Sequence, residues 1–138
     1  MATKPRYEFE VATQLEIDAA LRPFFQRFVV AEKRERVLSL FSPLRKRARP
    51  RDLVDAVDAS AVLHLDGSAR AEKAFARLAP QLEGILITGK PAAFRIRLSE
   101  MGSQFAYSDE ELFIARDGGS ALFKFEIGDD WLILPTTR

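Results

Sequence analysis

The clearest capacity for binding chemistry in this chain lies in a dense group of cations between positions 33 and 51. Eight Lys and Arg residues stand there against one acid, Glu35, which gives the segment a balance of +7. Guanidinium and ammonium groups at this density complement phosphate, so one hypothesis is that the segment binds nucleic acid or another anion. The eight candidate residues are Lys33, Arg34, Arg36, Arg45, Lys46, Arg47, Arg49 and Arg51.

Charge is polarised along the whole chain. The net charge is +6 up to Arg51 and −5 from Asp52 onward, although the total is only +1. A dipolar surface of this kind steers charged partners to one side of a molecule. The main hypothesis is therefore a small binding module that engages an unidentified protein partner through its charge-polarised surface. Nucleic-acid binding by the segment 33–51 is the alternative, and a solvated face or pairing with the acidic remainder of the chain is the competing interpretation.

A single histidine, His64, raises the question of acid–base catalysis. Asp66 stands two residues further on and would share its side of a β-strand. No nucleophile-elbow sequence accompanies the pair, and a metal site would lack a second histidine. A structural histidine is the preferred interpretation, so the sequence favours a protein that is not an enzyme and predicts no catalytic residue, metal or cofactor. An enzyme with an unrecognised site near His64 and Asp66 is the second alternative.

Residues 84–90 match the spacing of a phosphate-binding loop. The string Gly-Ile-Leu-Ile-Thr-Gly-Lys fits the pattern G-x-x-x-x-G-K, but Pro91 stands where such a loop needs Ser or Thr for magnesium. The apolar residues inside the match are typical of a strand. We therefore interpret the match as a strand with its exit turn.

Two acidic runs, Asp109-Glu110-Glu111 and Asp129-Asp130, are candidates for cation binding. Neither run has the spacing of a calcium-binding loop. Adjacent carboxylates are an ordinary feature of turns, so both runs are predicted to be solvated turn charges.

The elements that carry the basic segment are predicted to be helices. Thr13 and Glu16 form a capping-box pattern, so a helix is expected to begin at Gln14. Pro23 lacks an amide proton, which predicts a kink or break at residues 20–22 and a second amphipathic helix over residues 23–40. Lys33, Arg34 and Arg36 would then lie towards its carboxyl end, where the helix dipole favours each cation by about 0.3 to 1 kcal/mol. 

Two shorter helices are expected after this one. Ser42 and Pro43 resemble a helix cap followed by proline at the first helical position, which predicts a short basic helix or turn over residues 44–48. Pro50 would end it. Residues 52–57 are predicted to form another short helix.

The remaining chain predicts an α+β fold in which amino-terminal helices precede a β-α-β-like segment and a mostly antiparallel carboxyl-terminal sheet. A buried strand is expected over residues 61–65, a helix capped by Ser68 follows, and a strand at 85–88 completes the β-α-β pattern. Alternation then indicates four further strands with turns between them. The predicted strands are residues 94–98, 112–116, 121–127 and 131–134, and the predicted turns are residues 117–120 and 128–130.

Length and composition place the chain in a broad class. The 138 residues suit one domain spanning 1–138, and the absence of cysteine excludes disulfides and thiolate metal sites. No signal peptide and no apolar run of about 20 residues is present, so a cytoplasmic protein without a membrane partner is expected. The preference for arginine over lysine and the abundant alanine are typical of a bacterial protein. A homodimer is an alternative to a monomer if a sheet face or an edge strand is left uncovered by the rest of the chain.

Overall fold

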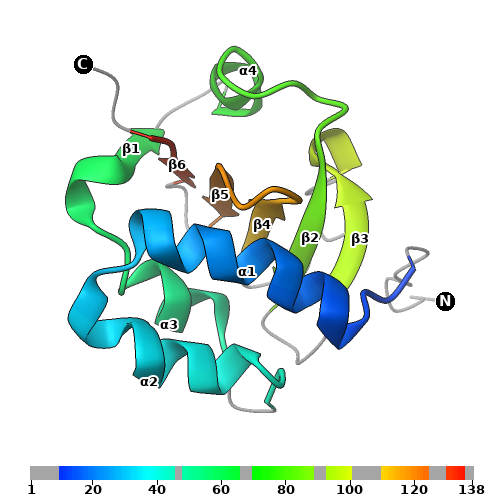
Figure 1. Ribbon diagram of the computed structural model, residues 1–138. Helices are drawn as coiled ribbons and strands as arrows, with labels where there is room; N and C mark the ends of the chain where they lie inside the picture. The colour runs from blue at the N-terminus through cyan, green and yellow to red at the C-terminus, as the bar shows by residue number, and fades with distance from the viewer. Residues whose placement is uncertain are drawn as a thin grey trace, which may run out of the picture.

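The computed structural model describes residues 10–45, 48–65, 70–88, 93–100, 110–124 and 130–135. It confirms the α+β class, with helices at the amino-terminal end and an antiparallel sheet formed by the later part of the chain (Figure 1). No described helix combines the length and the apolar composition needed to cross a bilayer.

Among the described residues, three α-helices precede the first strand, and a fourth lies between the first and second strands. The capping box is confirmed, because the Thr13 hydroxyl accepts from the Glu16 amide at 3.2 Å while the Glu16 carboxylate accepts from the Thr13 amide at 3.0 Å. The helices are α1 (Gln14–Phe28), α2 (Ala31–Phe41), α3 (Pro50–Val54) and α4 (Arg70–Phe75), with short 3-10 turns η1 (Ala59–Ala61) and η2 (Leu98–Glu100).

In the described part of the chain the sheet has six strands in the order β1-β6-β5-β4-β2-β3, and every neighbouring pair is antiparallel. The predicted meander is confirmed, since β4, β5 and β6 follow one another in sequence and in space. The strands that flank α4 are not neighbours, because three other strands separate β1 from β2. The strands are β1 (Val62–Leu65), β2 (Glu83–Thr88), β3 (Ala93–Arg97), β4 (Glu111–Ala115), β5 (Ala121–Lys124) and β6 (Asp130–Ile133).

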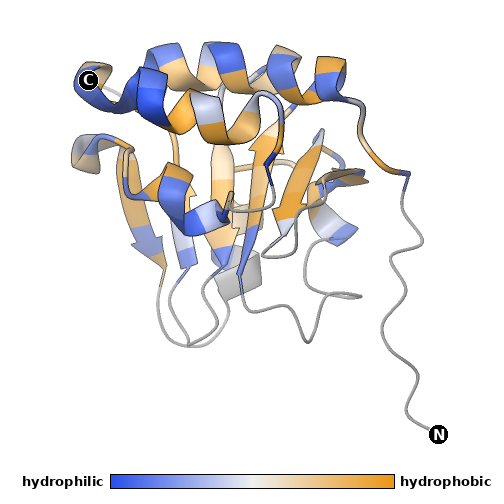
Figure 2. Cartoon of the chain, turned by 90° about the horizontal axis from the view of Figure 1, so that it is seen from below, coloured by the Kyte–Doolittle hydropathy of each residue, from blue (hydrophilic) through white to orange (hydrophobic). Residues whose placement is uncertain are grey.

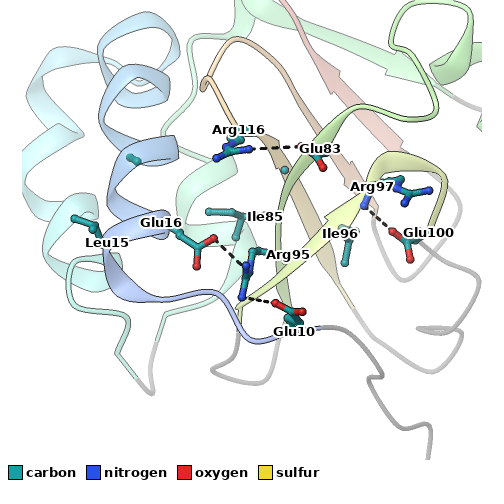
Figure 3. Close-up of a pocket in the computed structure, with 12 residues that line it drawn as sticks. Glu10, Leu15, Glu16, Glu83, Ile85, Arg95, Ile96, Arg97, Glu100 and Arg116 are labelled. Atoms are coloured by element: carbon teal, nitrogen blue, oxygen red, sulfur yellow. Dashed lines mark hydrogen bonds and ion pairs between the residues drawn. The ribbon is translucent and has the colours of Figure 1, made fainter.

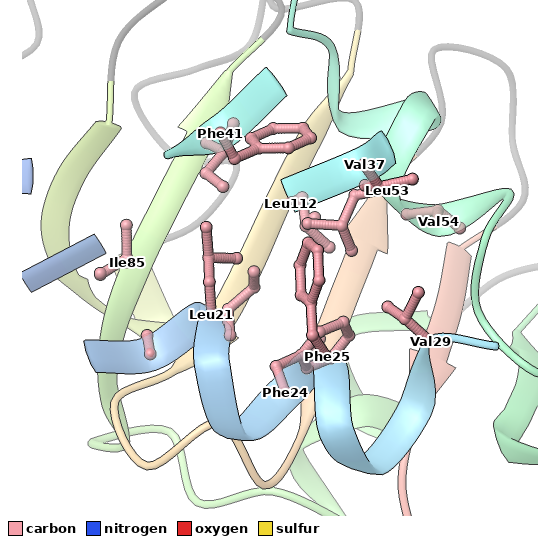
Figure 4. Close-up of a cluster of buried hydrophobic side chains, with 14 of the residues drawn as sticks. Leu21, Phe24, Phe25, Val29, Val37, Phe41, Leu53, Val54, Ile85 and Leu112 are labelled. Carbon is pink, nitrogen blue, oxygen red and sulfur yellow. The ribbon is translucent and has the colours of Figure 1, made fainter. Parts of the chain in front are cut away.

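The sheet carries a hydrophobic core on each face. Alternate strand residues such as Ile85 and Leu112 pack with α1, α2 and α3 (Figure 4). Residues of the opposite parity, such as Leu86 and Phe113, pack with Ala74 of α4. In Figure 2 the central strands are largely hydrophobic and the helices carry both kinds of residue, as expected for amphipathic helices that cover a sheet. Each fully buried Phe or Leu contributes about 1.5 to 3 kcal/mol.

Of the predicted kink or break before Pro23, the break is wrong, and so is a separate helix that begins at residue 23. Helix α1 runs through Pro23 and ends at Phe28, where Val29 becomes extended and forms a β-bridge with Val57. Proline frees the carbonyl four residues earlier, which belongs to Ala19. Because Ala19 is exposed, water can satisfy that carbonyl, and the buried face of the helix holds the two halves together.

The later start of α2 changes the position of its basic residues. Lys33 and Arg34 lie in the first helical turns and not near the carboxyl end, so the predicted stabilisation by the dipole of their own helix is wrong. Pro50 also has the opposite role from the predicted one: it occupies the first turn of α3 and begins that helix. The structure therefore contains no helix within the described part of residues 44–48, and α3 ends at Val54.

The predicted hairpin between β4 and β5 is confirmed. Gly118 in its turn has φ +71°, a conformation that favours glycine. A Cβ at this position would lie 2.6 Å from the Ala20 carbonyl oxygen and 2.7 Å from the Phe24 nitrogen. The turn thus packs directly against the backbone of α1, at the level of Pro23.

Candidate binding groove

A groove of about 680 Å³ lies between the first half of α1 and the strands β2 and β3 (Figure 3). Segments far apart in the sequence build it, because residues 10–19 form one wall and Arg116 follows β4. The lining residues are Glu10, Leu15, Glu16, Ala19, Glu83, Gly84, Ile85, Arg95, Ile96, Arg97, Glu100 and Arg116.

The register of the β2–β3 pair sets the arginine side of the groove. Arg95 is opposite Ile85 and Arg97 is opposite Glu83, so their side chains share the sheet face that α1 covers. Ile85 is buried in the core beneath α1, whereas Arg95 and Arg97 are exposed. The groove therefore lies where the helix no longer covers this face of the sheet.

Ion pairs hold the charged side chains of the groove in place. The Arg95 guanidinium lies between two carboxylates, with Nε 3.3 Å from Glu16 Oε2 and Nη2 against Glu10 Oε2. Arg116 Nη1 lies 3.5 Å from Glu83 Oε2 at another part of the wall (Figure 3). These pairs are largely exposed, so each stabilises the fold by at most about 1 kcal/mol. They place charges of both signs side by side along the groove.

Apolar side chains are exposed beside these charges. Leu15 on α1 is 80% exposed, and Val11, which precedes the helix, is 65% exposed. Among the described residues, only Leu63 joins them as an exposed large hydrophobic side chain. Of these three residues, Leu15 lines the groove. An exposed apolar side chain beside polar groups at a concave site is typical of binding sites.

The charged side chains that line the groove in the described part of the chain are glutamates and arginines. Hydrogen bonding from the Thr13 amide and hydroxyl, together with nearby Arg95 and Arg116, lowers the pKa of Glu16, so this carboxylate is ionised at neutral pH. A general acid or base needs a pKa near the working pH. Within the described ranges, no three His, Cys, Asp or Glu side chains are grouped so as to hold a metal ion.

Several residues of the predicted basic segment make structural contacts. Arg34 donates from Nε to the Val29 carbonyl at 3.0 Å and from Nη2 to the Gln26 carbonyl at 3.2 Å. It thereby satisfies carbonyl groups at the end of α1, where the helix dipole favours a cation. Arg34 is on α2, so the stabilising dipole belongs to the preceding helix.

Two further arginines of this segment also have partners within the chain. Arg45 Nε donates to the Ser39 carbonyl at 2.8 Å. Arg51 Nε lies 3.7 Å from Glu110 Oε2, an ion pair that connects α3 to the residue before β4. The remaining described members are Lys33, Arg36 and Arg49, for which no ion pair is found in the described part of the chain, while Lys46 and Arg47 lie outside the described residues.

His64 lies on the outer strand β1 and is exposed. The strand predicted at residues 61–65 is confirmed as Val62–Leu65, but its predicted burial holds only for Leu65. Its ring makes an edge contact with Trp131 at a centroid distance of 4.9 Å. This contact gives His64 a structural role. Asp66 lies outside the described residues, so the predicted pair with His64 stays a prediction.

Gly84 in the phosphate-loop match has a packing role. It lies inside β2, and an added Cβ would come within 2.6 Å of Phe113 Cζ and still closer to the Ile114 carbonyl oxygen. Glycine is therefore needed for the close approach of β4. Gly89 and Lys90, at the other end of the match, lie outside the described residues.

The prediction that Glu111 and Asp130 are solvated turn charges is wrong. Glu111 begins β4 and is 3% exposed, while Asp130 begins β6 and is 5% exposed. Both residues are opposite Lys124 of β5 in the sheet register. Burial, together with the neighbouring Asp130 carboxylate, raises the pKa of Glu111 to about 7, against the opposing effect of Lys124.

No protein-family model, curated protein or solved structure matches this chain. The groove must therefore be interpreted from its own chemistry. The strand predicted at residues 94–98 carries Arg95 and Arg97, but the sequence could not show the groove, because its walls come from segments about a hundred residues apart.

Proposed function

We propose that this protein is a non-catalytic binding module and that the groove beside α1 and β3 receives a segment of a protein partner. The observation that carries this proposal is the combination of exposed Leu15 with an arginine held between two carboxylates. Apolar contact supplies affinity at such a site, and fixed charges select the partner and its orientation.

The composition of the groove supports a protein partner over nucleic acid. Four glutamates and three arginines line it, so it offers no excess of positive charge for a phosphate backbone. In the basic segment, Arg34, Arg45 and Arg51 are engaged by carbonyl groups or by Glu110. These contacts reduce the number of cations that a polyanion would meet.

A displayed library of random peptides, panned against the purified protein, tests the proposal. Selected peptides should combine apolar with charged residues, and their affinity should fall at least about tenfold in Leu15→Asp and in Arg95→Gln, which corresponds to 1.4 kcal/mol or more. Position 15 suits this test because it is in the first turn of α1, where Asp is favoured. Arg36→Gln is the matched control, since Arg36 is exposed on α2 away from the groove.

Two results would overturn the proposal. The first is selected peptides whose affinity is unchanged by both groove variants. The second is salt-sensitive binding of labelled single-stranded DNA, duplex DNA or RNA between about 50 and 200 mM salt that is lost when Arg45, Lys46 and Arg47 are reversed in charge. That second result would establish the nucleic-acid alternative.

A further inference from the structure

The two outer strands of the sheet differ in how their edges are protected. Strand β3 is covered by residues 10–12: the Ala12 amide donates to the Ala93 carbonyl at 2.9 Å, and the Arg95 amide donates to the Glu10 carbonyl at 2.9 Å. Further along this edge, the Glu100 carboxylate accepts from the Arg97 amide at 2.8 Å. Covering loops and capping side chains are established ways to prevent edge-to-edge association.

Among the described residues, none covers or caps the edge of β1 in this way. Leu134 donates to the Ala61 carbonyl and Val62 is opposite Ile133, so residues 61, 63 and 65 direct their backbone groups towards β6. Val62 and His64 therefore direct theirs outward. The Val62 amide is bonded to the Ala59 carbonyl, which leaves the Val62 carbonyl and both backbone groups of His64 without a hydrogen-bond partner in the described part of the chain.

We propose that β1 pairs with β1 of a second copy of this chain, antiparallel and with Leu63 opposite its own symmetry mate. In this register the His64 amide of each copy donates to the Val62 carbonyl of the other. In an antiparallel ladder, hydrogen-bonded and non-hydrogen-bonded pairs alternate. Here the two Leu63 residues form a non-hydrogen-bonded pair, and the Val62–His64 pairs on either side of it carry the hydrogen bonds. It uses only backbone groups that the isolated chain leaves open, and it does not need the Val62 amide.

The side chains of β1 also favour a second copy. Leu63 is 41% exposed and would meet an identical apolar side chain at the symmetry axis. Strand β1 reads Val-Leu-His-Leu, so it presents no Lys, Arg, Asp or Glu that would repel an identical strand. A register centred on His64 would place two imidazoles directly opposite each other, whereas the Leu63 register places each imidazole opposite a valine.

The expected dimer is weak. Two paired strands of four residues bury much less than the roughly 1,200 to 2,000 Å² of a standard stable interface. Association should therefore depend on concentration, with monomer prevailing when the protein is dilute. The groove lies at β3, on the opposite edge of the sheet, so dimerisation leaves it open.

Sedimentation equilibrium from about 10 µM to about 1 mM tests the association, because this range covers weak dimers. The wild type should approach the dimer mass at the highest concentrations. Leu63→Lys, which adds like charges at the axis, and His64→Pro, which removes the outward amide, should both stay monomeric. Leu15→Lys is the matched control, since Leu15 is also exposed but lies on α1, and it should dimerise like the wild type.

Cysteine crosslinking tests the register, because the chain contains no cysteine of its own. Under mild oxidation Leu63→Cys should form a disulfide-linked dimer faster than either His64→Cys or Leu15→Cys. Faster crosslinking by His64→Cys would overturn the proposed register. A monomer at every concentration, or a dimer that persists in both Leu63→Lys and His64→Pro, would overturn the pairing itself.

Discussion

The two faces of the sheet accommodate charge in opposite ways. On the face covered by α1, charged side chains such as Glu16 and Arg95 stay at the rim and pair with one another in contact with water. On the face covered by α4, Glu111 and Asp130 are buried in the sheet itself. Carboxylates of the same chemistry therefore have opposite pKa shifts: lowered for Glu16 and raised to about 7 for Glu111.

Cross-strand register explains why the second face contains buried charge. Thr88, Glu111, Lys124 and Asp130 are successive partners across β2, β4, β5 and β6, and all share the face of Leu86 and Phe113. One end of this face is thus a polar row next to an apolar core. Glu111 Oε2 is buried without a hydrogen-bond partner in the described ranges, which accounts for the cost of its ionisation. Binding chemistry is consequently expected at the first face, and pH-dependent stability at the second.

Gly84→Ala, on the sheet face covered by α4, is expected to have the largest effect on the free energy of unfolding. The added methyl group would overlap the Phe113 ring and the Ile114 backbone, neither of which can move without shifting β4. We expect a loss of about 3 kcal/mol in the free energy of unfolding, measured by urea denaturation. Gly119→Ala is the control, because its added Cβ meets only the flexible ends of Asp117 and Arg27, and a loss as large as that of Gly84→Ala would refute this explanation.

Gly118→Ala tests the contact between the hairpin turn and α1 on the other face. Positive φ and the close approach to the Ala20 carbonyl together should cost about 2 kcal/mol. The same urea titration measures it. A variant as stable as the wild type would show that the turn does not pack tightly against the helix.

Glu111→Gln tests the buried carboxylate. The unfolded chain ionises this residue near its ordinary pKa of 4.5, whereas the folded chain retains the proton until about pH 7. Because the folded pKa is raised, the contribution of Glu111 to stability is fully present below pH 4.5, falls as the pH rises to about 7 and then levels off. After allowance for solvent screening, the fall should be on the order of 2 kcal/mol.

Urea midpoints measured between about pH 4 and pH 8 should show this fall in the wild type and not in Glu111→Gln. Glu35→Gln, exposed on α2, is the control for removal of a carboxylate as such. Equal pH dependence in Glu111→Gln and the wild type would mean that another group causes it.

Local signals were sufficient to predict much of the fold. The capping box at Thr13, the turn at Gly118 and the alternation in β3 each depend on neighbouring residues, and each is confirmed. Pro23 misled the prediction because local sequence shows the missing amide but not the water-exposed carbonyl or the packed helix face that compensate for it.

Burial and side-chain partners could not be predicted from neighbouring residues in the sequence. Glu111 was predicted to be solvated because it follows two acids, but its burial is set by its partners on β2 and β5. Likewise, Arg34 was predicted to belong to a charged surface. Its side chain instead reaches the carboxyl end of α1 and donates to the Val29 carbonyl. Burial and partner choice follow from strand order and helix ends, and neither could be derived from the periodicity of the sequence.

Glu16→Gln at the groove is expected to have the smallest effect on the free energy of unfolding. The pH dependence that Glu16 contributes should have the opposite sign from that of Glu111. Hydrogen bonds from Thr13 and the nearby arginines favour the ionised form and lower the pKa of Glu16, so its contribution to stability is present above its ordinary value of 4.5 and is lost as the pH falls below it. Gln preserves the shape of the capping box but removes the charge that pairs with Arg95. The variant should therefore lose little stability at neutral pH and should unfold less steeply than the wild type on acidification below about pH 4. If Glu16→Gln and Glu111→Gln changed the pH profile in the same direction, the contrast between the two faces of the sheet would be wrong.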